Sequence, residues 1–110
     1  NGGLTLARHL PVRFDLQAET TLPSGDPLRL AHQIRQDMWR VLQNLRGFSP
    51  VVQVMPCDAG WHITAGGRLL APATQTSRQQ VQDVLETGRN RARWMRHAAR
   101  GRTDREGLVT

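Results

Sequence analysis

The feature that most constrains the fold is an amphipathic pattern over residues 27–46. Apolar side chains recur there at helical spacing, at positions 28, 30, 31, 34, 38, 41, 42 and 45, and together they give a broad apolar face. Asp26 suits the N-terminal cap of such a helix, Pro27 its first position and Gly47 its end. At about 1.5 Å per residue this helix spans about 30 Å, the width of a small domain. A second layer is needed to bury its apolar face.

Two segments rich in β-forming residues follow the helix and supply that layer. Residues 51–55 read Val-Val-Gln-Val-Met, and residues 61–65 read Trp-His-Ile-Thr-Ala. The five-residue turn between them contains a glycine, so a β-hairpin is predicted. Because a lone hairpin is marginal in water, we expect the long helix to cover it. Gly66 and Gly67 end the second strand, unless a glycine bulge there lets the strand continue.

The N-terminal part of the chain carries weaker patterns. The apolar residues in 1–11 show neither helical nor strand-like spacing, and we expect a flexible segment there. Residues 12–16 alternate between apolar and polar side chains, which predicts a short strand or an extended arm that pairs with an edge of the hairpin. Residues 17–25 are polar and end in a Pro-Ser-Gly turn, so no strand is predicted over them.

The C-terminal third is predicted to be helical. Thr76 or Ser77 can cap a second helix. A narrow apolar stripe follows at Val81, Val84 and Leu85. Gly88 either ends this helix, so that a third one covers residues 89–100, or lies inside one long helix at a cost of about 1 kcal/mol. Residues 101–110 are polar and are predicted to be a flexible tail.

These elements predict a single two-layer α+β domain over residues 12–100. In it a long amphipathic helix packs on a small antiparallel hairpin or sheet, and one or two C-terminal helices follow. No apolar run reaches the roughly 18 residues that a membrane-spanning helix needs. No secretory signal is recognisable either, so we expect a cytoplasmic protein.

The positive charge is concentrated in one part of the chain. The sequence has a formal net charge of +6, and all 15 of its basic residues are Arg. Residues 88–102 contain six Arg and no acidic residue, whereas the other 95 residues balance nine Arg against nine acids. Arg-rich codon usage accounts for the choice of Arg over Lys, but it does not account for this position. Any argument from charge to function therefore concerns the C-terminal segment.

If residues 89–100 are helical, their arginines form an amphipathic basic helix. One stripe holds Arg89, Arg93, Arg96 and Arg100, with Arg91 and Arg102 at its margins. Trp94 and Ala98 lie on the opposite face, where they can pack on the domain. The planar guanidinium matches phosphate oxygens, so this face predicts binding to nucleic acid or to another anionic partner. Four phosphate contacts on duplex DNA predict a log–log salt slope of about −3.6. The alternative is a solvated basic face with no ligand.

The edge of the long helix offers a second candidate surface. Arg35, Trp39 and Arg46 lie together at the boundary of its apolar face. Arg and Trp are enriched at the anchor points of protein interfaces, so the alternative function is a protein–protein adaptor or a homodimer that uses the long helix and the edge of the hairpin. The basic helix would then bind an acidic protein surface. The competing interpretation is that Trp39 covers the core, and that the aliphatic parts of the Arg side chains lie over the indole.

An enzymatic function is the third and least favoured hypothesis. Cys57 on the predicted turn, with Asp58 and with His62 on the opposing strand, is the one local set that resembles a nucleophile and a base. Its spacing matches no known motif. With a single Cys and no two His at helical i, i+4 spacing, we expect neither a metal site nor a cofactor. The sequence therefore favours a non-enzymatic binding protein.

Overall fold

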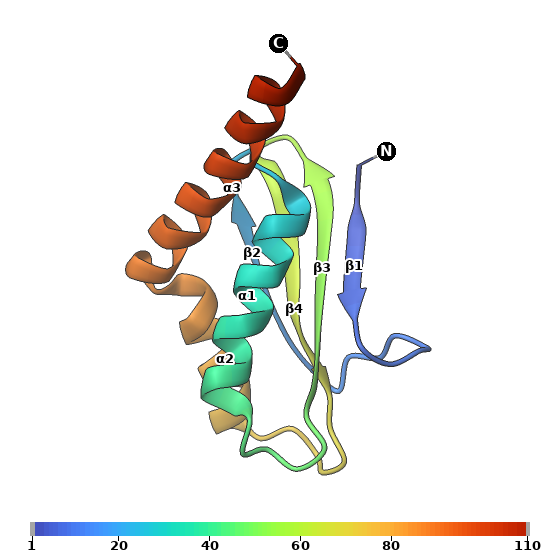
Figure 1. Ribbon diagram of the computed structural model, residues 1–110. Coiled ribbons are helices and arrows are strands. Elements are labelled where there is room, and N and C mark those ends of the chain that lie inside the picture. Colours follow the sequence, from blue (N-terminus) through green and yellow to red (C-terminus); the bar gives the residue numbers. More distant parts are fainter. Residues whose placement is uncertain (1, 110) are drawn as a thin grey trace.

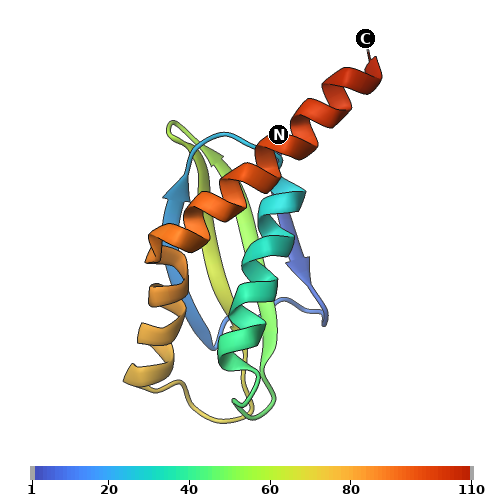
Figure 2. The ribbon, with the colours of Figure 1, turned by 60° about the vertical axis from the view of Figure 1, so that its left-hand side comes forward.

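The computed structural model describes the backbone of residues 2–109 and the side chains of residues 2–99. Within this part, the strands and helices follow in the order β1 (Leu4–Ala7), β2 (Leu16–Leu22), α1 (Pro27–Leu42), β3 (Ser49–Cys57), β4 (Gly60–Arg68), α2 (Gln75–Glu86) and α3 (Gly88–Val109). The strands form one four-stranded sheet in the order β1-β3-β4-β2, in which every pair is antiparallel. The helices cover one face of this sheet (Figures 1 and 2). The predicted two-layer α+β fold is confirmed.

The core lies between the sheet and the helices. Alternate residues of each strand face the helices, as in the row formed by Leu6, Val52, Ala65 and Ala18 across the four strands. From α1 the core receives Leu30, Ala31, Ile34, Met38 and Leu42. The predicted stripe of α2 and the predicted packing residues of α3, Trp94 and Ala98, are also buried. The helical spacing in the sequence therefore identified most of the residues that the three helices bury, but Leu28 and Val41, which were predicted on the apolar face of α1, are exposed.

Helix α1 is shorter at its C-terminal end than the sequence predicts. It ends at Leu42, not at residue 46. Beyond it, Leu45 N donates to Leu42 O and Phe48 N donates to Leu45 O, so two tight turns replace the last helical turn. Gly47 lies in the second of these turns with a φ of +70°, a conformation that suits glycine. Leu45 still packs against the core, which explains why its position fits the helical pattern. The side chain of Asp26, predicted to accept a capping hydrogen bond from a backbone N–H of the first turn, does not do so.

The hairpin is longer than predicted and its loop is shorter. Strand β3 extends to Cys57 and β4 begins at Gly60, so only Asp58 and Ala59 connect them. Gly66 and Gly67 lie inside β4 in continuous register with both neighbours, not at its end or in a bulge. A Cβ at Gly66 would lie 1.8 Å from Leu16 O, so this glycine allows the close approach of β2.

The two edge strands differ most from the sequence prediction. The strand predicted over residues 12–16 lies instead at Leu16–Leu22, where Leu16, Ala18 and Leu22 are buried. Small or polar side chains separate these positions, so the alternation was too weak to recognise. Residues 1–11 were predicted to be flexible, but β1 lies within them. Leu4 and Leu6 pack on the core once β1 pairs with β3, and this pairing over a long sequence distance leaves no local signal.

The start of α2 also differs from the prediction. Its cap is Thr74, and Ser77 is the third helical residue of a capping box. Ser77 N donates to Thr74 Oγ1 at 3.0 Å, and Thr74 N donates to Ser77 Oγ at 2.9 Å. Thr87 then adopts an extended conformation, which separates α2 from α3. The chain therefore forms two separate helices here, not one long helix that runs through Gly88.

Asp15 fastens the segment between β1 and β2 to the end of β4. Its Oδ2 accepts hydrogen bonds from Leu69 N at 2.9 Å and from Arg13 Nη2 at 2.8 Å. The bond from the Leu69 backbone, and after it the bond from Arg13, lowers the pKa of Asp15 below its ordinary value of 3.8. Ionised Asp15 is therefore favoured in the folded chain.

This contact predicts a dependence of stability on pH. A carboxyl group whose pKa is lowered by folding stabilises the fold above its unfolded pKa, and this contribution disappears as the pH falls through the folded value. We expect Asp15→Asn to unfold at lower urea concentration than the wild type at about pH 6, and the difference to shrink below about pH 4. Urea titrations across this range test it, with Asp58→Asn at the exposed hairpin loop as the control. A difference that persisted unchanged at low pH would contradict this role of the carboxylate.

Candidate functional site

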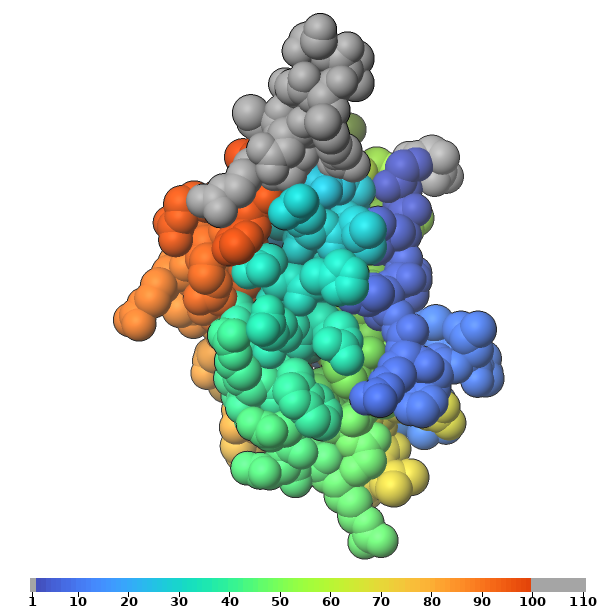
Figure 3. Space-filling view, viewed as in Figure 1, coloured from blue at the N-terminus to red at the C-terminus, as the bar shows by residue number. Residues whose placement is uncertain are grey.

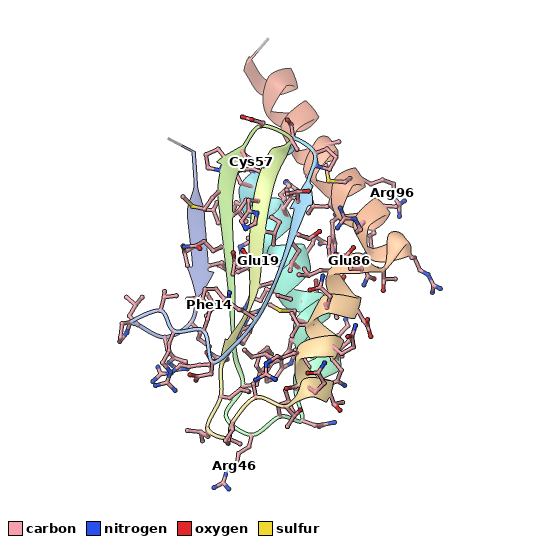
Figure 4. All side chains as sticks on the ribbon, turned by 180° about the vertical axis from the view of Figure 1, so that it is seen from behind. Phe14, Glu19, Arg46, Cys57, Glu86 and Arg96 are labelled. Carbon is pink, nitrogen blue, oxygen red and sulfur yellow. The ribbon has the colours of Figure 1, made fainter. Side chains whose placement is uncertain are left out.

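The predicted basic residues of α3 divide into two groups. Arg91 and Arg93 contact the rest of the fold. Arg91 donates to Leu85 O at 2.9 Å, to Thr20 Oγ1 at 2.8 Å and to Thr21 O at 2.6 Å, so it ties α3 to the outer edge of β2. Arg89 and Arg96 are exposed, and neither makes a hydrogen bond or ion pair with another described residue. Figure 4 shows Arg96 pointing away from the fold. The side chains of residues 100–110, Arg100 and Arg102 among them, lie outside the described part of the chain. The backbone of residues 101–109 is described, and it continues α3 where a flexible tail was predicted.

Arg93 belongs to a polar cluster between α1 and α3 that the sequence analysis missed. Its centre is Asp37 of α1, which is only 8% exposed. Oδ2 of Asp37 accepts from Trp94 Nε1 at 2.7 Å and pairs with Arg93, while Oδ1 pairs with Arg40 at 3.2 Å. Two features of the sequence could have predicted this cluster. A buried indole N–H needs an acceptor, and Asp37 lies one position from buried Met38. Arg93 therefore stabilises the packing of α3.

The predicted surface on α1 is partly assembled. Arg35 and Trp39 line a surface hollow of about 250 Å³, together with Arg8, His9, Phe48, Ser49 and Pro50. A shallower depression of about 390 Å³ shares His9, Phe48 and Ser49 with it and adds Gly47, Arg68 and Leu70. We call the two together the basic–aromatic hollow. Arg46 does not line it, and in Figure 4 this side chain extends from the end of the fold.

The hollow depends on residues far apart in the sequence. Arg8 and His9 follow β1, and the pairing of β1 with β3 brings them beside α1. Figure 3 shows this N-terminal segment against α1, with residues of β3 between them. Sequence analysis assigned residues 1–11 no regular structure, and therefore missed Arg8 and His9. No local pattern marks them, because their position follows from strand pairing alone.

The charge and shape of the hollow suit an anionic ligand with a flat ring. No acidic side chain is among the described residues that line it. Arg8 and Arg35 form no ion pair with any described residue. The indole of Trp39 is 41% exposed, and it stacks on the buried ring of Phe48 with centroids 6.2 Å apart and planes at 12°. A cationic wall and a supported aromatic ring therefore face the same space.

The geometry around Cys57 does not form a nucleophile–base pair. Cys57 lies on β3 opposite Gly60, not on a turn as predicted, and its side chain is exposed. Nε2 of His62 lies 2.8 Å from Glu19 Oε1, so the partner of His62 is a carboxylate on β2. Figure 4 shows Cys57 near the tip of the hairpin and Glu19 farther along the sheet.

Other classes of site were sought within the described residues. No three His, Cys, Asp or Glu side chains come close enough together there to hold a metal ion. None of the helices in that part of the chain is long and apolar enough to cross a membrane. Comparison of the chain with protein-family models, with curated proteins and with solved structures finds no match. The proposals below therefore rest on the geometry alone.

Proposed function

We propose that the protein is a non-enzymatic, cytoplasmic module that binds nucleic acid. The observation that supports this is the convergence of Arg8 and Arg35 on one hollow that no described acidic side chain lines. Guanidinium groups without an acidic neighbour favour an anionic ligand, and a phosphate backbone presents such anions at regular intervals. We propose the contact at the hollow and not along the whole predicted basic helix, because Arg91 and Arg93 of that helix already contact the rest of the fold.

Charge reversal at the hollow tests this function. We expect the double variant Arg8→Glu/Arg35→Glu to bind a fluorescein-labelled oligonucleotide roughly 10- to 100-fold more weakly than the wild type at low salt. If both residues contact phosphates of a single strand, the log–log salt slope should also become shallower by about 1.4. Fluorescence anisotropy between about 50 and 200 mM salt measures both quantities.

The matched control is the double variant Arg46→Glu/Arg78→Glu. It changes the net charge by the same amount, but neither residue lines the hollow. Equal losses for the two double variants would show that net charge, not the hollow, governs binding. No detectable binding by the wild type at low salt would refute the proposed function.

The exposed arginines of α3 support a second contact region for the same ligand. Arg89 and Arg96 have no partner among the described residues. We expect Arg89→Glu/Arg96→Glu to weaken binding less than Arg8→Glu/Arg35→Glu does, because no aromatic ring accompanies these two guanidinium groups. A larger loss of affinity for the α3 variant in the same anisotropy titration would show that α3, and not the hollow, is the main binding surface.

The alternative function is a protein–protein adaptor or homodimer that uses the surface of Trp39. The observation that favours it is that α1 exposes three large apolar side chains, those of Leu28, Trp39 and Val41. Sedimentation of the purified protein distinguishes the two functions. A stable dimer that Trp39→Ala dissociates, together with a salt slope near zero, would support the adaptor.

A further inference from the structure

We infer that the basic–aromatic hollow takes an unpaired nucleotide of a single-stranded nucleic acid, whose base stacks on Trp39 while its phosphates contact Arg8 and Arg35. This inference rests on the proposed function and narrows it from nucleic acid in general to single strands. Three features support it: the rigid position of the indole, the cations that lie beside it and the access that a single strand gives to the faces of its bases.

Trp39 is held as a rigid platform. It projects from α1, whose adjacent residue Met38 is fully buried in the core. The Phe48 ring, nearly parallel to the indole, supports it and is itself only 8% exposed. The backbone of Phe48 donates a hydrogen bond from its N–H to Leu45 O. An indole supported in this way loses little further freedom when a second ring stacks on it, which favours binding.

The cations of the hollow complement the phosphates that accompany a base. Arg8 and Arg35 line the same hollow as Trp39, and Arg68 lines the adjoining depression. A ligand that runs through both would meet the indole first and further positive charge next. Sites for single strands combine aromatic rings with a positively charged groove in this way. The arrangement therefore fits a short stretch of single strand better than an isolated base.

The stacking of bases argues against duplex. The part of the hollow that Arg8, Arg35 and Trp39 line has a volume of only about 250 Å³, so a ligand must bring one exposed face of a base to Trp39. The base pairs of a duplex are stacked on each other, so their faces cannot reach Trp39 without the cost of unstacking. A single strand exposes the faces of its bases without that cost.

The closing experiment compares Trp39→Ala with the wild type on two probes. These are an oligothymidylate of about 12 nucleotides and a blunt DNA duplex of the same length. We expect Trp39→Ala to bind the oligothymidylate roughly 5- to 150-fold more weakly, the range for loss of one stacked base. Its affinity for the duplex should change less than about twofold. Leu28→Ala, at another exposed apolar residue of α1, is the control and should leave both affinities unchanged.

A second measurement does not depend on the stability of that variant. Trp39→Phe keeps an aromatic ring and should retain most of the affinity for oligothymidylate. Titration with the same probe should quench the tryptophan fluorescence of the wild type but not that of Trp39→Phe, in which Trp61 and Trp94 remain. Equal quenching in both proteins would overturn the inference.

The outcomes separate this inference from the proposed function. If no probe binds, both fail. If Arg8→Glu/Arg35→Glu weakens binding but a folded Trp39→Ala does not, the protein binds nucleic acid and the stacking site is refuted. If Trp39→Ala lost the same affinity for single strand and for duplex, the stacking site would also be refuted, because stacking on Trp39 requires an exposed base.

Discussion

Gly66→Ala is expected to destabilise the folded protein by about 4 kcal/mol or more, or to prevent folding. The new Cβ would lie 1.8 Å from Leu16 O and 2.8 Å from Gln17 Cα, and both atoms belong to the backbone of β2. A side chain can rotate away from such a contact, but a paired strand cannot. The φ of Gly66 is also +156°, which side chains rarely adopt. Relief would require β2 to move away from β4, and that movement would expose the core.

Gly88→Ala is the matched control. A Cβ at Gly88 meets nothing within 4 Å, and this glycine has no positive φ. Because it begins α3, alanine there should be neutral or should stabilise by up to about 1 kcal/mol. Urea unfolding of the three proteins, followed by circular dichroism, measures the effect. Equal midpoints for Gly66→Ala and the wild type would contradict the pairing of β2 with β4.

Asp37→Ala should have the second large effect and lower the free energy of unfolding by about 3–5 kcal/mol. The substitution removes the acceptor of Trp94 Nε1 and the counter-charge of Arg93. Trp94 is fully buried, so its N–H would be left without a partner in the core. Asp37→Asn keeps an oxygen at this position but loses the charge, and should have an intermediate effect. Urea unfolding is the measurement.

A double-mutant cycle with Trp94→Phe isolates the central hydrogen bond. Phenylalanine has no N–H, so Asp37→Ala should cost less in the Trp94→Phe background than in the wild type. Equal costs in the two backgrounds would show that the Asp37–Trp94 bond contributes nothing to stability. Asp58→Asn, on the exposed loop of the hairpin, is the control and should change stability by less than about 0.5 kcal/mol.

The candidate site could be predicted only in part. Arg35 and Trp39 were recognisable because helical spacing places both at the edge of one apolar face. Arg8 was not, since it follows a four-residue strand whose only evidence is its pairing with β3. The position of Arg93 on a helix was predictable, but its partner was not. An ion pair with Asp37 depends on how α3 crosses α1, and no property of either helix alone specifies that crossing.

The amino-acid sequence by itself determined what local periodicity and chemistry can determine. The apolar spacing of α1, the stripe of α2 and the face of α3 that carries Trp94 all follow from interactions within a few residues along the chain. The tertiary structure decided which strands form the edges of the sheet, where Gly66 allows two backbones to approach and which of the described arginines have no partner among the described residues. The physical reason is that strand pairing and burial of charge join residues far apart in the sequence. These interactions contribute to the free energy of folding only after the sheet and the helices have packed together.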